Sequence, residues 1–203
     1  MALYLASTSP RRHQLLNDCG FQFEILKPGS DEIEAPGESP RAMVERFATE
    51  KALSSLDVLP ASARIGVIIT ADTTVVSPDR KKILNKPNSP EVARKMLRTL
   101  SGKTHTVLTG FVICAFDAGK ITRWHQEVVK TSVTLRKLTP AEVAAYVSSG
   151  EPLDKAGAYA AQGIGMCLIE AIRGSYSNVV GLPMTELTQA LEKKFKVVPN
   201  WKR

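Results

Sequence analysis

The chain has 203 residues, of which 43% are hydrophobic and 23% charged. This balance is that of an ordinary globular protein, so disorder, a collagen helix and a coiled coil are excluded. No apolar run approaches the roughly 18 residues of a membrane-spanning helix, so we expect no membrane partner. The 27 Lys and Arg residues against 20 Asp and Glu give a net charge of +7, which favours anionic partners such as nucleotides, nucleic acid or acidic lipid.

The elements expected along the chain alternate between strands and helices. The first half shows a buried strand at 3–6, a helix from 9–10 to about 19 with Gly20 as its C-cap, a strand at 21–26, a loop at 27–40, a helix from 39–40 to about 56, a buried strand at 65–69 and a turn at 77–82. The Ser-Pro pairs that open these helices place a cap and then proline at the first helical position.

The second half continues the alternation. It shows a helix from 89–90 to about 100, a β-hairpin of 104–116 and 121–135, a helix from 139–140 to about 148, a glycine-containing loop at 150–165, a strand at 168–172 and a last helix from 182–183 to about 195. Alternating elements with one antiparallel pair predict an α/β fold with a mixed sheet, and we expect a single domain over residues 1–203.

Cysteines and histidines point away from disulfides and metal clusters. Cys19, Cys114 and Cys167 are too far apart for a disulfide framework or a zinc site, which indicates a reducing, cytoplasmic compartment and three small buried residues. The histidines show no metal-ligand spacing. The N-terminal segment, 1–10, is too short and too poor in basic residues for a signal peptide.

The first candidate site is the helix start at Ser9-Pro10. Its second and third helical positions are Arg11 and Arg12, where cations oppose the helix dipole by about 0.3–1 kcal/mol each. A bound anion would remove that conflict, because it would meet the dipole, backbone N–H groups and two guanidinium groups together. The alternative is that both arginines simply extend into water.

Lys51 is the second candidate. It lies seven residues after Val44 and four after Phe47 on the expected 40–56 helix, which places it on the inward apolar face. Its ammonium group either reaches out along the surface or meets a buried anion.

Acidic residues form the third candidate. Asp72 follows the buried strand at 65–69, where ligands bind in open α/β sheets, and its carboxylate could hold a metal or deprotonate water. Asp31 and Glu32, in the loop after the second strand, could add oxygen ligands for a cation. A local turn at Asp72 and solvated loop acids are the alternatives.

Two further positions complete the set. Lys86, just before a helix, adds a cation, and Gln162, in the glycine-containing loop, could read a base edge through an amide that both donates and accepts. Common nucleotide motifs fail: SGKT at 101–104 lacks the first glycine of a P-loop, because position 97 is Leu97.

These motifs together resemble the Maf family of nucleoside triphosphate pyrophosphatases. The matching segments, in the order in which the family has them, are LASTSPRR at 5–12, EKA at 50–52, ADT at 71–73, KP at 86–87, the segment 150–163 and VGLP at 180–183. Two features depart from the pattern: Thr70 stands where many members have glycine, and the turn at 77–82 is longer and more basic.

The resemblance implies an elongated mixed-sheet fold, similar to that of inosine triphosphate pyrophosphatases, with a cleft between two lobes. It implies hydrolysis of a nucleoside triphosphate to a monophosphate and pyrophosphate with a divalent cation, Mg or Mn, in a cytoplasmic homodimer. It also implies a role in removing modified nucleotides and a link to septum formation.

The segments 71–73 and 153–159 resemble the branch of the family that acts on dTTP and UTP, whereas the 7-methyl-GTP branch usually has Gln after the aspartate. By that match Arg11, Thr73 and Gln162 take the specificity positions and Asp72 accepts the proton. Ser7, Arg12, Lys51 and Lys86 would bind substrate, and Glu32 with Asp72 would hold the metal. The two roles of Asp72 compete, because a metal-bound carboxylate is a poorer base.

A second hypothesis is a regulatory protein that binds nucleotides or nucleic acid without catalysis. It would use the +7 charge and show a steep dependence of binding on salt. The sequence offers no aromatic residues interleaved with basic ones and no recognised reading motif, so we expect no stable nucleic-acid partner.

Overall fold

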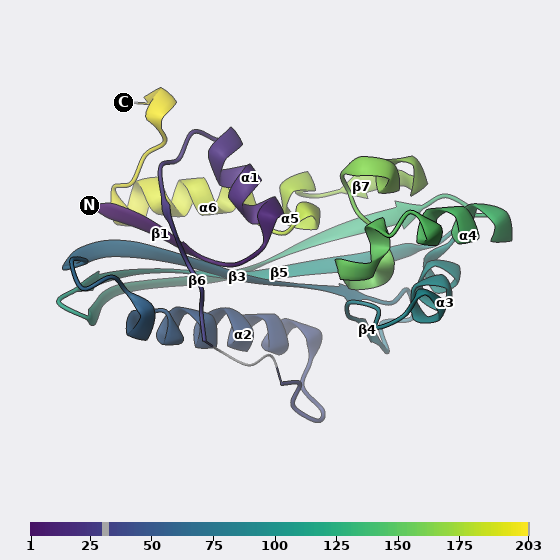
Figure 1. Cartoon of the computed structure of the whole chain (residues 1–203), viewed down its shortest axis with the longest axis horizontal. Helices are drawn as coiled ribbons and strands as arrows, with labels where there is room; N and C mark the ends of the chain where they lie inside the picture. Colours follow the sequence, from purple (N-terminus) through teal and green to yellow (C-terminus); the bar gives the residue numbers. More distant parts are fainter. Residues whose placement is uncertain (30–32, 203) are drawn as a thin grey trace. The chain divides into compact units, whose positions relative to one another are not determined.

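The computed structural model describes residues 1–29 and 33–202, so Asp31 and Glu32 lie outside the described residues. The strands are β1 (Ala2–Ala6), β2 (Glu24–Leu26), β3 (Ile65–Val76), β4 (Ile83–Leu84), β5 (Thr104–Asp117), β6 (Lys120–Leu135) and β7 (Ile169–Arg173). The helices are α1 (Pro10–Asp18), α2 (Pro40–Ser54), α3 (Pro90–Leu100), α4 (Pro140–Ser148), α5 (Tyr176–Val180) and α6 (Met184–Ala190) (Figure 1).

These strands form a mixed sheet in the order β2-β1-β3-β5-β6-β7, with β4 paired to β3 off this path. Strand β1 pairs in parallel with both β2 and β3, whereas the β3–β4 and β6–β7 pairs are antiparallel. The predicted α/β fold with a mixed sheet is therefore confirmed.

The chain divides into two compact units. Unit 1 comprises residues 1–72, 109–128 and 181–203, and unit 2 comprises residues 73–108 and 129–180. Strands β3, β5 and β6 contribute residues to both units. The cleft expected from the family resemblance stays a prediction.

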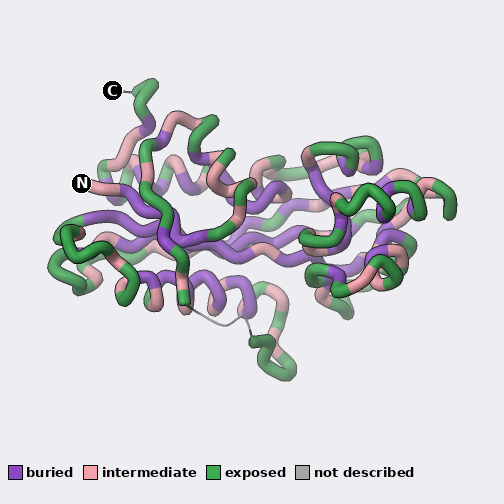
Figure 2. The backbone as a smooth tube through the Cα atoms, viewed as in Figure 1, coloured by how far each residue is buried: buried purple, intermediate pink, exposed green. Residues whose placement is uncertain are grey.

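In unit 1, helices cover both faces of the strands. Helix α2 covers one face of the strands, and α1 and α6 cover the other (Figure 1). Part of the core on the α2 side is formed by Ala48 and Ala52 of the helix against Ile68, Val112 and Phe116 of the strands. Figure 2 shows β1, β3 and β5 as mostly buried and the loops as mostly exposed, whereas the half of β6 that belongs to unit 1 is mostly exposed or half-buried.

Unit 2 has a core of its own, to which α3, α4, the loop that follows α4 and several strands contribute. Its buried members include Leu97 of α3, Tyr146 and Val147 of α4, and Tyr159 of the loop. Val75 of β3 belongs to the same cluster.

The helix boundaries follow the predicted signals closely. The side chains of Ser39, Ser89 and Thr139 accept hydrogen bonds from the backbone N–H of the third residue of α2, α3 and α4, respectively. At the end of α1, Gly20 has φ of +75°, and the N–H of Phe21 donates to the carbonyl of Leu16 at 3.1 Å. This is the left-handed cap expected for glycine at that position.

The bounds of several predicted elements, and the predicted burial of two cysteines, were wrong. The second strand begins at Glu24 rather than at Phe21, because the N–H of Phe21 is used to close the end of α1 on the carbonyl of Leu16. The strand expected at 65–69 continues to Val76, and the last helix ends at Ala190, followed by a π-helical turn to Phe195. Cys167 is exposed, not buried, and Cys19 is half-buried; only Cys114 is buried.

Candidate active site

The turn between β1 and α1 is held together by Ser7 and Arg12. Ser7 is buried, and its hydroxyl accepts from the N–H of Ser9 at 3.2 Å and from Nη1 of Arg12 at 3.3 Å. Nε of Arg12 donates to the carbonyl of Gly181 at 2.8 Å. The guanidinium of Arg12 is therefore anchored to the protein on one edge rather than extended into water.

Helix α1 starts without the usual cap. Within the described residues, Ser9 makes no side-chain cap hydrogen bond and the first turn carries no acidic residue. Its amino end therefore has a dipole that no carboxylate of its own first turn offsets, with half-buried Arg11 and Arg12 beside it. The anion site predicted there stays a prediction.

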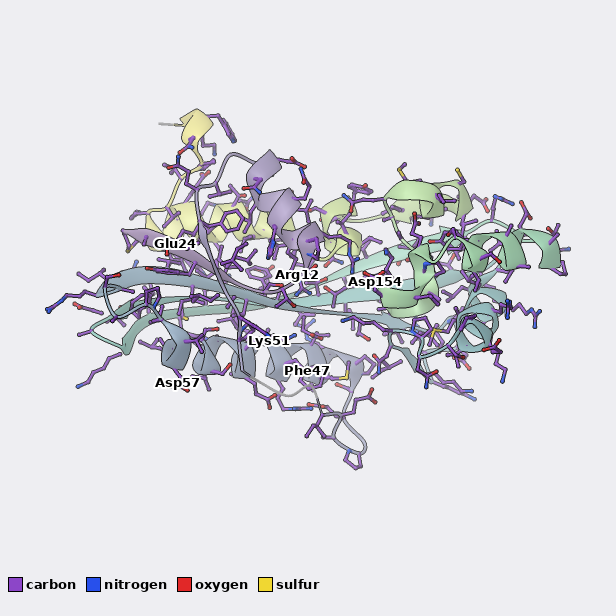
Figure 3. The ribbon with its side chains drawn as sticks, in the orientation of Figure 1. Arg12, Glu24, Phe47, Lys51, Asp57 and Asp154 are labelled. Atoms are coloured by element: carbon purple, nitrogen blue, oxygen red, sulfur yellow. The ribbon has the colours of Figure 1, made fainter. Side chains whose placement is uncertain are left out.

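Helix α2 presents Lys51 to the strands. Val44, Phe47 and Ala48 form the buried stripe of the helix, and Lys51 continues it at an exposure of 7%. Figure 3 shows Phe47 and Lys51 on this helix, next to the strands. The prediction that Lys51 faces inward is confirmed.

The buried anion that pairs with Lys51 is the carboxylate of Asp72. Nζ of Lys51 lies 2.7 Å from Oδ1 of Asp72, and the side chains are only 9% and 11% exposed. At such low exposure the two charges are poorly screened by water, so they attract each other more strongly than an exposed pair, but burying both charges has a cost of its own. The structure thus brings together two residues that the sequence singled out separately.

Asp72 lies within β3, not past its end as expected. Strand β3 pairs with β1 as far as Ile69 and with β4 from Val75 onward, and Asp72 belongs to the stretch between these two pairings. Because side chains alternate along a strand, Thr70 and Asp72 share the face that α2 covers. Thr70 confirms this, since its hydroxyl donates to the carbonyl of Ala48 at 2.6 Å.

The remaining candidates belong to unit 2. Thr73 is half-buried in β3, Lys86 is exposed just before α3, and Gln162 is half-buried at the start of a 3₁₀ helix, Gly163–Leu168. The structure ties Ser7 to Arg12 and Lys51 to Asp72. That these groups and the unit 2 residues bind one substrate stays a prediction.

A divalent cation would have to use few protein ligands. Among the described residues there is no group of three His, Cys, Asp or Glu side chains that could hold a metal. Asp72 places a carboxylate at the site, and Mg²⁺ commonly binds through one or two carboxylates plus substrate phosphates. The donor set therefore fits a cation bound together with a nucleotide, with Glu32 outside the described residues as the expected second carboxylate.

Sequence reasoning missed the residues that hold the segment containing Gln162. The carboxylate of Glu151 accepts hydrogen bonds from the hydroxyl of Tyr146 and from the N–H groups of Ile164 and Gly165. In the sequence, the only signal was an acidic residue, Glu151, in the same loop as two closely spaced glycines, Gly163 and Gly165.

Comparison with known proteins shows the family to which the chain belongs. A family model described as "Maf-like protein" matches residues 2–194. The chain belongs to the Maf-like family. This Maf-like chain has relatives named "dTTP/UTP pyrophosphatase" in several bacteria. The relative from Photorhabdus laumondii is 41% identical over 196 residues, covering 97% of this chain and 95% of its own length.

Two other relatives of the Maf-like chain carry the same name. The one from Escherichia coli O157:H7 is 44% identical over 190 residues, covering 94% of this chain and 91% of its own length. The one from Vibrio cholerae is 44% identical over 191 residues, covering 94% and 97%. A nucleoside-triphosphatase (dITP/XTP pyrophosphatase) structure from Mycobacterium abscessus is 11% identical and covers 97% of this chain and 96% of its own, but its TM-score of 0.41 is too low to carry an argument.

Proposed function

We propose that this chain hydrolyses dTTP and UTP to the nucleoside monophosphate and pyrophosphate. The observation that carries the proposal is the buried Lys51–Asp72 pair, 2.7 Å apart, in a Maf-like chain whose relatives at 41–44% identity are named dTTP/UTP pyrophosphatases. Modified pyrimidine nucleotides belong to the same substrate class. Roles in removing such nucleotides and in septum formation are extensions of this proposal.

The cationic residues of unit 1 bind the triphosphate. Arg11 and Arg12 stand at the amino end of α1, where the helix dipole also favours an anion. Ser7 and the carbonyl of Gly181 fix the orientation of the Arg12 guanidinium, so little side-chain freedom is lost when phosphate binds. Lys51 is held by Asp72 and acts on the phosphates next to that carboxylate.

Asp72 accepts the proton from the attacking water. The water oxygen bonds to the α-phosphorus, the bond from that phosphorus to the bridging oxygen breaks, and pyrophosphate leaves with the bonding electrons. Lys51 holds the carboxylate in one orientation, which a general base requires.

A divalent cation, Mg or Mn, would be held by Asp72 together with Glu32 and would offset the negative charge of the phosphates. Asp72 then serves either as base or as ligand in a given step. Thr73 and Gln162 pair with the polar edge of thymine or uracil, because a hydroxyl and an amide can each donate and accept. Exposed Lys86 adds a contact to phosphate.

We also propose that the enzyme works in the cytoplasm as a homodimer and has no stable nucleic-acid partner. Within the described residues, no helix has the length and apolar character needed to cross a membrane.

The test is a panel of nucleoside triphosphates incubated with the pure protein, with Mg²⁺, with Mn²⁺ and with a chelator, followed by measurement of pyrophosphate. We expect release from dTTP and UTP to exceed release from GTP and to require the cation. In water labelled with ¹⁸O, the label should appear in the monophosphate. Equal rates on all nucleotides would contradict the preference, and binding without pyrophosphate release would leave only the non-catalytic hypothesis.

A further inference from the structure

The segment of unit 2 that carries Gln162 is fixed on both sides by side chains. Before Gln162, the N–H of Ala160 donates to the hydroxyl of Tyr146 at 3.1 Å, and the carbonyl of Ala161 accepts from the hydroxyl of Tyr176 at 3.0 Å. After it, the N–H groups of Ile164 and Gly165 both donate to the carboxylate of Glu151. The backbone on either side of the amide therefore has little freedom.

Glu151 is the centre of this arrangement. One oxygen, Oε1, accepts from the hydroxyl of Tyr146 and the N–H of Gly165, both at 2.8 Å, and Oε2 accepts from the N–H of Ile164 at 2.9 Å. The Tyr146 hydroxyl thus links the carboxylate to Ala160, so one acid and one phenol hold both flanks of Gln162. Hydrogen bonds to an ionised acceptor are stronger than neutral ones.

The glycines of the segment allow this close approach. A Cβ at Gly163 would lie 2.4 Å from Oε2 of Glu151, and φ of Gly163 is +65°. At Gly165, a Cβ would lie 2.3 Å from the carbonyl oxygen of Ala160 and 2.7 Å from the hydroxyl of Tyr146. Both glycines leave room for the carboxylate and its tyrosine, as expected where a backbone closes tightly around another group.

The hydrogen bonds described above engage the backbone on either side of Gln162 and not its side-chain amide. Gln162 is half-buried with extended backbone angles, φ −126° and ψ 166°, and among the described residues its side chain caps no helix. A rigid backbone that presents a side-chain amide suits the reading of a polar ligand, because little entropy is lost on binding.

We propose that Glu151 is a positioning residue for nucleobase recognition: by accepting from Tyr146, Ile164 and Gly165, it holds Gln162 at the distance at which its amide pairs with a pyrimidine. This rests on the proposed function. The carboxylate already accepts from one tyrosine and two backbone N–H groups of its own unit, so its role is in the choice of nucleotide rather than in bond cleavage.

The test compares Glu151→Gln with the unchanged chain. The glutamine has the same shape, but its NH₂ group cannot accept, so one N–H of the segment loses its acceptor and the backbone shifts. We expect the KM for dTTP to rise and the ratio of kcat/KM for dTTP over GTP to fall about tenfold, as for the loss of one buried hydrogen bond. We expect kcat for dTTP to change less than about threefold.

Glu142→Gln is the matched control. Glu142 lies in the same unit and also accepts three hydrogen bonds, from the N–H and hydroxyl of Thr139 at 2.8 and 2.9 Å and from Arg136 at 2.7 Å. It caps α4 and should leave the nucleotide ratio unchanged even if the melting temperature falls. An unchanged ratio in the Glu151 variant, or an equal fall in both variants, would overturn the proposal.

Two further measurements separate this inference from the proposed function. With Gln162→Ala already present, Glu151→Gln should lower the nucleotide ratio no further, and an additive loss would overturn the positioning role. Amide hydrogen exchange at Ile164 and Gly165 should accelerate in the Glu151 variant, and unchanged exchange would also overturn it. If the unchanged chain hydrolyses no nucleotide, the proposed function fails, but faster exchange still supports the role of Glu151 in holding the segment.

Discussion

The Lys51–Asp72 pair is a costly way to fill a protein interior. Desolvating an ammonium and a carboxylate costs several kcal/mol each, and their attraction often does no more than offset that cost. An apolar pair of similar volume would therefore serve stability as well at two positions that are 7% and 8% exposed. The proposed chemistry at Asp72 would account for a pair that stability alone does not require.

His105 is a second buried ionisable residue, and it sets an expected pH dependence. Burial lowers its pKa to about 4, whereas in the unfolded chain a histidine titrates near about 6.5. Nε2 lies 2.8 Å from the hydroxyl of Tyr159, and, counting only described residues, Nδ1 is buried without a hydrogen-bond partner. Charging this ring inside the protein is therefore unfavourable.

Between pH 4 and 6.5 the unfolded chain binds the proton and the folded chain does not. The free energy of unfolding should thus fall as the pH drops through this window, by up to about 3 kcal/mol from this residue. Urea unfolding at pH 7 and pH 4.5 measures the loss. His105→Gln should remove the part of this loss that comes from His105. If the unchanged chain and the variant lose the same unfolding free energy between the two pH values, His105 does not titrate as its burial implies.

At the scale of elements, the site depends on how α2 packs on the strands. The hydroxyl of Thr70 in β3 donates to the carbonyl of Ala48 in α2. Gly110 of β5 lies so close to the helix that a Cβ there would be 2.5 Å from the carbonyl oxygen of Val44. These contacts fix the distance between α2 and the strands, and with it the position of Lys51.

Gly110→Ala should push α2 away from the strands, because the atoms that the new methyl group meets are backbone atoms and cannot rotate aside. We expect a loss of about 1–3 kcal/mol in unfolding free energy, together with reduced turnover. Gly29→Ala is the control, since a Cβ there would meet nothing within 4 Å. Denaturant unfolding of both variants measures the effect, and a Gly110 variant as stable as the control would contradict this packing.

Helix ends were predictable because their signals are local. A Ser or Thr cap, a proline and the glycine at position 20 each fix backbone geometry within one turn. The length of β3 was not predictable in this way. Apart from Ala71, residues Thr70–Thr74 are polar and look like a turn, but their threonines are β-branched and suit a strand once its neighbours and α2 are in place.

At the scale of the molecule, two compact units each build a core of their own. The candidate phosphate ligands Arg11, Arg12 and Lys51 belong to unit 1, and the candidate base-reading residues Thr73 and Gln162 belong to unit 2. The net charge of +7 favours the approach of a triphosphate to the whole molecule.

The site was only partly predictable from the sequence, because some of its features are local and others depend on tertiary packing. Helical spacing placed Lys51 inside, because it depends on one helix alone. Its pairing with Asp72, 21 positions away in the chain, depends on tertiary packing, as does the convergence of three donors on Glu151. Those contacts have no local signature in the residues that make them.

The most direct test of the account is pyrophosphate release from dTTP by Asp72→Asn, measured beside Asp57→Asn, which changes an exposed aspartate of the same unit. The asparagine keeps the shape of Asp72 but cannot accept the proton, so turnover should fall by at least about 10²–10⁴-fold, the usual contribution of a general base. Circular dichroism should show the folded state in both variants, and the Asp57 variant should keep full activity. An Asp72 variant that still releases pyrophosphate at the rate of the unchanged chain would contradict the central claim.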